Sequence, residues 1–181
     1  MTFSSNMPAP ASPAHCLRAA TPEDVAFQVL LYATTRREEM DAAGFPAGMR
    51  EAFVAMQFEA QRAHYAQHYP AANYSIIECN GARAGRLIVH RAEDHFNIID
   101  IALMPEYRGR GIGRVLLQEV IAEATAKQFP IRLFAFTGER AIRLYHRLGF
   151  ADVHDDGLHT ELVWRPLTPL DKPAPAGRFP A

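Results

Sequence analysis

The stretch MPEYRGRGIGR, residues 104–114, places three glycines at alternate positions among three arginines. It follows a nearly continuous apolar run at 96–103, which predicts a central strand, and it opens an amphipathic helix expected at 112–127. Glycines let the turn take positive φ values, and the N–H groups of the first helical turn point to one place at the positive end of the helix dipole. Together with the arginines, this arrangement predicts a site for a pyrophosphate-bearing ligand.

Two other phosphate-binding patterns fit this stretch less well. A dinucleotide-binding fold needs G-x-G-x-x-G after its first strand, whereas the spacing here is G-x-G-x-G, deep in the chain. A nucleoside-triphosphate loop needs G-K-[ST] after four spacer residues, and the sequence contains no such motif. The remaining alternative is a flexible basic loop without a ligand, which the preceding strand and the following helix disfavour.

Composition narrows the class of protein further. The chain has 181 residues, which suits one domain, and its 19 basic and 20 acidic residues leave a net charge of −1. That balance argues against a general nucleic-acid-binding or membrane-surface protein, and no run of 18 apolar residues predicts a membrane span. Cys16 and Cys79 are too few for a disulfide scaffold and fit a reducing, cytoplasmic setting. Prolines gather at both ends, which predicts disordered tails at 1–14 and 166–181 around a core of 15–165.

The apolar patterns predict elements in the order β-α-α-β-β-β-α-β-α-β-β. Strands are expected at 15–19, 74–79, 85–90, 95–104, 131–136, 150–154 and 159–164. Helices are expected at about 22–33, 50–68, 112–127 and 139–148, with a connecting loop at 36–49. Asn80-Gly81 is a strong hairpin turn, and the strand, helix and strand between 95 and 136 predict a right-handed parallel crossover.

These motifs resemble those of the GNAT superfamily, the GCN5-related N-acetyltransferases. The pyrophosphate motif of that family, [QR]-x-x-G-x-[GA], reads Arg108 to Gly113 here, after a strand exit at 101–107. A second family motif, a helix of the form A-x-x-L-Y-x-x-x-G-F, reads AIRLYHRLGF at 141–150. The resemblance implies a mixed α/β (α+β) fold with a mostly antiparallel sheet of six to seven strands. About four helices would flank the sheet, which would contain one splayed parallel strand pair.

The resemblance also implies acetyl-CoA as the donor, with no metal, in a wedge between the strands at 96–104 and 131–136. Backbone groups left unpaired in such a wedge suit the amides of pantetheine. In family terms, the backbone of Ile101 and Leu103 would hold the pantetheine, and an N–H near Leu103 would stabilise the oxyanion. The implied cofactor-binding residues are Ile101, Ala102, Leu103, Arg108, Gly109, Arg110, Gly111, Ile112, Gly113, Arg114, Gly138 and Tyr145.

Two residues of the second motif region carry separate expectations. Tyr145 matches the family tyrosine that protonates the departing CoA thiolate, which is feasible because a thiol has an ordinary pKa of about 8.5 and a phenol one of about 10. The alternative is a core residue, because Tyr145 shares a helix face with Ala141 and Leu148. Gly138 departs from the family, since many members have asparagine there, and this puts the contacts of that asparagine in question.

The general base is less well defined by the sequence. Asp100 is the first candidate, because it is an acid in an otherwise apolar strand beside the loop, where burial would make it a stronger proton acceptor. Its alternatives are a solvent-facing strand position or a structural hydrogen bond. Glu78, His90 and His95 are weaker candidates. If the acceptor is an α-amino group with a pKa of about 8, a positioned water would suffice.

The function that the resemblance implies is transfer of an acetyl group from acetyl-CoA to a primary amine of a small molecule, peptide or protein, by direct attack in a ternary complex. The alternative is a catalytically degenerate acyl-CoA-binding sensor or scaffold, which Gly138 favours. We expect the acceptor site to use the first two helices, their loop at 36–50 and the hairpin tip at 155–159. The charged residues that could read the acceptor are Arg36, Arg37, Glu38, Glu39 and Asp41, or these form a solvated helix end. The resemblance also allows a homodimer through the last strands.

Overall fold

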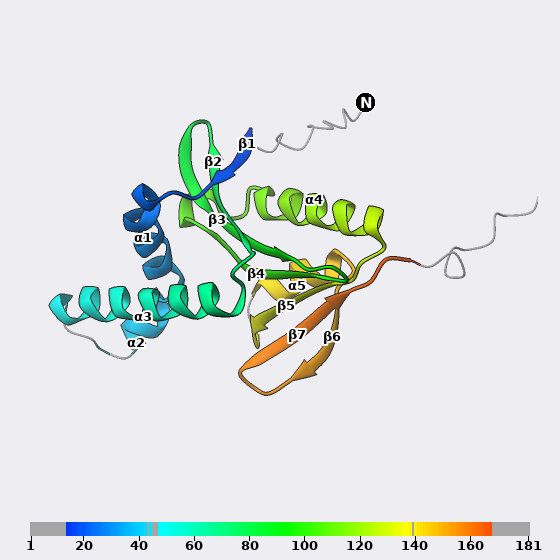
Figure 1. Ribbon diagram of the computed structural model, residues 1–181. Coiled ribbons are helices and arrows are strands. Elements are labelled where there is room, and N and C mark those ends of the chain that lie inside the picture. The colour runs from blue at the N-terminus through cyan, green and yellow to red at the C-terminus, as the bar shows by residue number, and fades with distance from the viewer. Residues whose placement is uncertain (1–13, 43, 45–46, 139, 168–181) are drawn as a thin grey trace, which may run out of the picture. The chain divides into compact units, whose positions relative to one another are not determined.

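The structure is a computed structural model that describes residues 14–167, apart from 43, 45–46 and 139 (Figure 1). The chain divides into two compact units, which are described in turn. The first comprises Met1–His90 and Ile99–Leu117, and the second comprises Arg91–Ile98 and Gln118–Ala181. The predicted tails, 1–14 and 166–181, lie almost wholly outside the described residues. The predicted domain limits of 15 and 165 stay a prediction.

The first unit is built on antiparallel strands. Strand β1 (His15–Ala19) pairs with β2 (Asn73–Cys79), and β2 pairs with β3 (Ala82–Arg91). Asn80 and Gly81 both have positive φ, 50° and 78°, as the hairpin turn expected between β2 and β3 requires. The later part of β4 (Phe96–Leu103) continues this unit, and the Met104 N–H donates to the Ala84 carbonyl at 2.8 Å.

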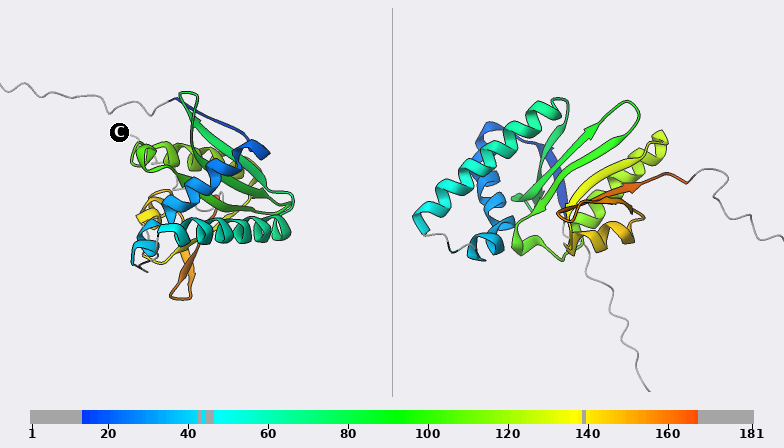
Figure 2. Two further views of the ribbon diagram at one scale, coloured as in Figure 1. Left: turned by 90° about the vertical axis from the view of Figure 1, so that its left-hand side faces the viewer. Right: turned by 90° about the horizontal axis from the view of Figure 1, so that it is seen from below.

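Helices cover one face of these strands (Figure 2). A short 3₁₀ helix, η1 (Pro22–Asp24), leads into α1 (Val25–Thr35), and α2 (Arg37–Ala42) and α3 (Ala47–His68) follow. Phe27 and Leu31 of α1 are buried with Ile76 of β2, and Ala102 and Met104 pack against them. This apolar contact fixes α1 beside the end of β4.

The loop predicted at 36–49 is wrong in part, because residues 37–42 form α2 and α3 begins at Ala47. The polar composition of 36–49 gave no indication that an apolar side chain within it is buried. Met40 is buried and joins Tyr32, Val54 and Phe58 in a core cluster. Most of the stability of helices in proteins comes from tertiary packing, so the burial of Met40 supports a short helix that local propensity would not predict.

The second unit contains the start of β4 and the last strands. β4 pairs in parallel with β5 (Ile131–Phe136), β5 pairs antiparallel with β7 (His159–Trp164), and β7 pairs with β6 (Ala151–Asp155) (Figure 1). Helix α4 (Ile112–Lys127) enters this unit from the first, and α5 (Arg140–Arg147) lies between β5 and β6 in sequence. The predicted ranges of β5, β7 and α4 are confirmed.

The fold class implied by the family resemblance is confirmed. The strand order is β1-β2-β3-β4-β5-β7-β6, mostly antiparallel with β4 and β5 as the parallel pair, and the described residues form five α-helices. The register of the parallel pair runs from Phe96 opposite Ile131 to Ile98 opposite Leu133, and both strands continue beyond it. Within the described part of the chain, none of the helices combines the length and hydropathy that a membrane span requires.

Candidate functional site

The glycine–arginine loop follows β4 in the first unit and has the backbone expected of an anion site. Residues Pro105–Tyr107 form a 3₁₀ turn, η2, and Gly109 and Gly111 have φ of +74° and +83°. Those values lie in the left-handed region, where a side chain would be strained. A Cβ placed on Gly109 would meet nothing within 4 Å, so the backbone there is open to a ligand.

Helix α4 begins at the end of this loop. The Gly111 carbonyl accepts the Val115 N–H at 3.1 Å, which sets the helical register from Gly111 onward. The first N–H groups of a helix have no acceptor within that helix, so those of Ile112, Gly113 and Arg114 are available for a ligand. They add to the positive end of the dipole of a 16-residue helix.

Arg108 and Arg110, two of the three arginines of the loop, differ in what they contact. All three are exposed. The Arg110 guanidinium lies over the Tyr107 ring, 5.7 Å from its centroid, and remains at the surface. Arg108 instead donates from Nε to the Leu103 carbonyl at 2.7 Å and from Nη2 to Thr34 Oγ1 at 3.1 Å. Two of the five N–H donors of its guanidinium are therefore committed to the protein.

The predicted strand contacts at Ile101, Ala102 and Leu103 lie just before this loop. All three residues are half-buried. Gly85 of β3 allows the close approach of β3 and β4, because a Cβ there would meet the Ala102 carbonyl oxygen at 2.2 Å. The end of β4 is thus held by its neighbouring strand up to the first residue of the loop.

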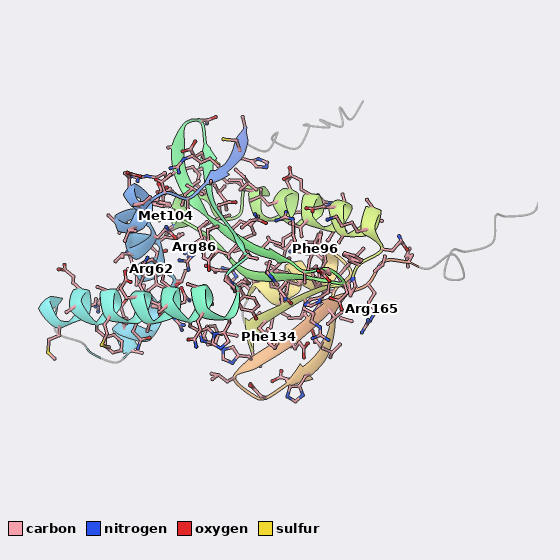
Figure 3. The ribbon with its side chains drawn as sticks, in the orientation of Figure 1. Arg62, Arg86, Phe96, Met104, Phe134 and Arg165 are labelled. Carbon is pink, nitrogen blue, oxygen red and sulfur yellow. The ribbon has the colours of Figure 1, made fainter. Side chains whose placement is uncertain are left out.

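Asp100, the predicted base, makes an ion pair inside the first unit. Arg86 of β3 donates from Nε to Asp100 Oδ2 and from Nη2 to Gln61 Oε1 of α3, at 2.8 Å for the latter. Arg86 is 5% exposed and the Asp100 side chain 19% exposed. Figure 3 shows Arg86 on the strand, between the sheet and the helices. The role of Asp100 as a general base stays a prediction. Its contact with Arg86 is of the kind expected from the alternative, a structural hydrogen bond.

The surroundings of this pair are aromatic. The Arg86 guanidinium lies over the Phe58 ring at 5.8 Å. Burial raises the pKa of Tyr65, and the negative charge of Asp100 raises it further. Arg86 and Gln61 were not singled out from the sequence. An arginine beside the apolar run at 87–89 was the available signal, but only the register of the strands brings it to Asp100.

Tyr145, the predicted acid, lies in the second unit on α5. Its side chain is buried, and its ring lies 5.8 Å from that of Phe150 in an edge-on arrangement. Gly149 has φ of +90°, and the Phe150 N–H donates to the Tyr145 carbonyl at 3.1 Å, which closes the helix as the sequence predicted. Its role as an acid stays a prediction.

Gly138, where many family members have asparagine, also has a left-handed backbone, with φ of +84°. A Cβ at this position would meet nothing within 4 Å. Asparagine adopts this conformation more readily than most residues do. The turn before α5 therefore has a shape that asparagine tolerates, but it lacks the side-chain amide.

The segments expected to contact an acceptor are largely occupied by local contacts. Arg36 lies over an aromatic ring of α1, and Asp41 pairs with Arg50 at 2.7 Å, while the side chains of the glutamates at 38 and 39 lie outside the described residues. At the hairpin tip, Asp156 accepts the N–H groups of Leu158 and His159, which lowers its pKa. These contacts explain the local turns and helix ends without a substrate.

Two further observations concern ligands. An open groove of about 810 Å³ in the first unit is lined partly by Phe27, Leu30 and Met104, beside the start of the loop. Among the described residues, no three His, Cys, Asp or Glu side chains gather as a set of metal ligands. The fold and the loop together define a mixed α/β protein with a turn of left-handed glycines after its central strand.

Comparisons with known proteins agree with this class. The model of the acetyltransferase (GNAT) family matches residues 34–150. The chain belongs to this family, so the resemblance drawn from the two motifs is confirmed. A search of curated protein sequences found no match.

Solved structures with the same fold include three acetyltransferases. One is the PaiA N-acetyltransferase of Thermoplasma acidophilum in complex with coenzyme A, with a TM-score of 0.65 and 15% identity over 84% of this chain and 99% of that one. A second, described as histone acetyltransferase HPA2 and related acetyltransferase, from Corynebacterium glutamicum, has a TM-score of 0.61 and 22% identity over 87% and 98%. A third, a GNAT family acetyltransferase from Elizabethkingia anophelis with acetyl-CoA bound, has a TM-score of 0.53 and 16% identity over 83% and 97%.

Proposed function

We propose that the protein is an N-acetyltransferase that moves an acetyl group from acetyl-CoA to a primary amine of a small molecule, peptide or protein. The observation that carries this proposal is the loop before α4, where left-handed glycines and exposed arginines surround the open start of a helix. Membership of the GNAT family supports it, as do the coenzyme A and acetyl-CoA named for two of the similar structures.

The residues present fit the pyrophosphate of acetyl-CoA. The N–H groups of Ile112, Gly113 and Arg114 would hold its oxygens, with charge from Arg110 and Arg114. Gly109 and Gly111 would allow close approach of the backbone. The backbone of Ile101 and Leu103 would hold the pantetheine amides. The donor supplies the thioester whose acetyl group is transferred.

Tyr145 is the proposed acid. When the amine displaces the thiolate, that sulfur needs a proton, and a phenol that is withheld from water can supply it. The burial of Tyr145 supports such a dry position. Substitution by phenylalanine removes the proton and retains the ring that packs against Phe150.

The amine must lose its proton before it attacks, and Asp100 is the proposed side chain for this step. Its ion pair with Arg86 competes with that role, because a carboxylate paired with a guanidinium holds a proton less readily. An α-amino acceptor needs no such base, since about half of it is unprotonated near pH 8. A pH profile separates the two: with Asp100 as base, Asp100→Asn lowers kcat at all pH values, and with water it leaves kcat at high pH almost unchanged.

The second candidate function is a CoA-binding module without catalysis, which the glycine at 138 favours because it lacks the amide of the family asparagine. Calorimetry with acetyl-CoA and a panel of primary amines scored by free thiol release tests both functions. We expect micromolar binding, turnover with at least one amine, and a fall in kcat of about 100-fold or more in Tyr145→Phe. Tight binding without turnover across the panel would favour the module, and absence of binding would exclude both.

A further inference from the structure

We infer that Arg108 is a positioning residue that ties the last turn of α1 to the end of β4, so that its side chain organises the donor site and does not hold phosphate. The name Arg108 clamp is used for Arg108 with its two acceptors, the Leu103 carbonyl and Thr34 Oγ1. All three residues belong to the first unit. The inference rests on the proposed function for its kinetic consequences, and its structural content can be tested without a ligand.

Arg108 contacts the peptide group that joins Leu103 to Met104. Its carbonyl accepts from Arg108 Nε at 2.7 Å, and its N–H donates to the Ala84 carbonyl at 2.8 Å. Both polar groups of this peptide are therefore held from opposite sides. Because a peptide group is planar and rigid, these two bonds fix the orientation of the backbone at Leu103, where the pantetheine is proposed to bind.

Thr34 provides the second acceptor of the Arg108 clamp. Its hydroxyl donates to the Leu31 carbonyl at 2.7 Å, one turn earlier in α1, so the oxygen is turned to accept from Arg108 Nη2 at 3.1 Å. The same helix packs against Ala102 and Met104 through Phe27 and Leu31. The Arg108 clamp extends this apolar contact by a polar one near the C-terminal end of α1.

The shape of the Arg108 guanidinium matters for the clamp. A guanidinium presents Nε and Nη2 in a fixed planar fork, whereas a lysine ammonium is a single point of charge on a flexible stem. Lysine at 108 would retain the charge that a phosphate needs and could not bridge the two acceptors with the same geometry. A phosphate contact and a clamp therefore predict different results for the same substitution.

The chain offers a matched control for Thr34. Thr35, the next residue, donates in the same way to the Tyr32 carbonyl at 2.8 Å, whereas Arg108 donates to Thr34. Thr34→Val removes the acceptor for Arg108 and retains shape. Thr35→Val makes the same chemical change one position along, and Thr34→Ser restores the hydroxyl.

The experiment first measures acetyl-CoA binding and kinetics in the full chain. We expect Thr34→Val to lower kcat/KM for acetyl-CoA threefold to tenfold, with Thr34→Ser and Thr35→Val close to the wild type. Arg108→Lys should lose at least as much as Thr34→Val, and the double variant should lose no more than Arg108→Lys alone. If Arg108→Lys is nearly wild type, Arg108→Gln is impaired and Thr34→Val has no effect, Arg108 is a phosphate contact and the clamp is overturned.

A second measurement is independent of the donor. Amide hydrogen exchange of the ligand-free protein should show faster exchange at the Met104 N–H in Thr34→Val and Arg108→Lys, but not in Thr35→Val. Unchanged exchange in both variants overturns the clamp even if acetyl-CoA binds. If the wild type binds no acetyl-CoA and the exchange still rises, the proposed function fails and the clamp stands.

Discussion

Two groups of charged side chains in the first unit differ in whether their charge is accessible to solvent or paired inside the protein. The loop after β4 carries arginines at the surface, on a backbone that left-handed glycines keep open. Between the sheet and α3, Arg86 is almost fully buried, and it is paired with Asp100 and hydrogen-bonded to Gln61. Charge that is left accessible on a shaped backbone can bind a ligand, whereas charge that is buried and paired holds the fold together.

Arg108 lies between these two cases. It is at the surface like Arg110, but its donors are engaged like those of Arg86. Position in a motif therefore does not decide what a cation does, because Arg108 and Arg110, two positions apart, have different partners. The following predictions test the contrast between accessible and paired charge, beginning with the largest expected effect.

Removing the buried cation should have the largest effect on stability. Arg86→Met leaves the Asp100 carboxylate without its partner, and we expect a loss of about 3 kcal/mol in the free energy of unfolding in urea. Arg62→Met is the control, because Arg62 pairs with Glu59 at the exposed surface of α3 and should cost less than about 0.5 kcal/mol. Equal losses in the two variants would contradict the contrast.

Straining the loop backbone should weaken donor binding more than it weakens the fold. Gly109→Ala forces a side chain into the left-handed region at a cost of about 1–2 kcal/mol, and we expect acetyl-CoA to bind about tenfold to hundredfold less tightly by calorimetry. Gly157→Ala, in the β6–β7 turn, is matched, since φ there is +85° and a Cβ also meets nothing within 4 Å. It should lose similar stability and retain donor affinity.

Asp24 is a further buried carboxylate that is paired with an arginine. It is 2% exposed and accepts from Arg18 at 2.6 and 2.7 Å, which holds the pKa of the carboxyl well below its usual range. Because the folded pKa is depressed, the stabilisation is present above the unfolded pKa and is lost as pH falls toward the folded one. Asp24→Asn should cost about 1.5 kcal/mol at pH 7.

The same variant should flatten the decline in stability below about pH 5. Urea unfolding at a series of pH values measures this slope. Asp41→Asn is the control, because Asp41 pairs with Arg50 at an exposed site, with more than half of its side chain open to solvent. A slope unchanged by Asp24→Asn would show that other carboxyls dominate.

The smallest effect is expected for single exposed arginines of the loop. Arg114→Gln should weaken acetyl-CoA binding about threefold to fivefold, because one accessible charge at the proposed pyrophosphate site is partly screened by salt. The wild-type affinity should fall with added salt more steeply than that of the variant. A stability change above about 0.5 kcal/mol would indicate that Arg114 is part of the fold instead.

Local patterns predicted much of this molecule correctly. Asn80-Gly81 set the β2–β3 turn and Gly149 set the end of α5 through the backbone preferences of these residues, and Pro130 separated α4 from β5. The α2 helix was missed because its one buried anchor, Met40, carries no signal without the partners that bury it.

The candidate site divides in the same way. The glycines of 109–113 are close together in sequence, so the turn that they form before α4 could be predicted directly from the chain. The partners of Asp100 and Arg108 could not, because Arg86, Gln61 and Thr34 come from other strands and helices.

By itself, the sequence determined the family and the local geometry of the turns in the loop after β4, because these depend on residues within short stretches. Only the tertiary structure decided which charged side chains are paired with other groups of the protein. That outcome depends on strand register and helix packing, which place Arg86 beside Asp100, and Thr34 beside Arg108, across 14 and 74 positions of the chain.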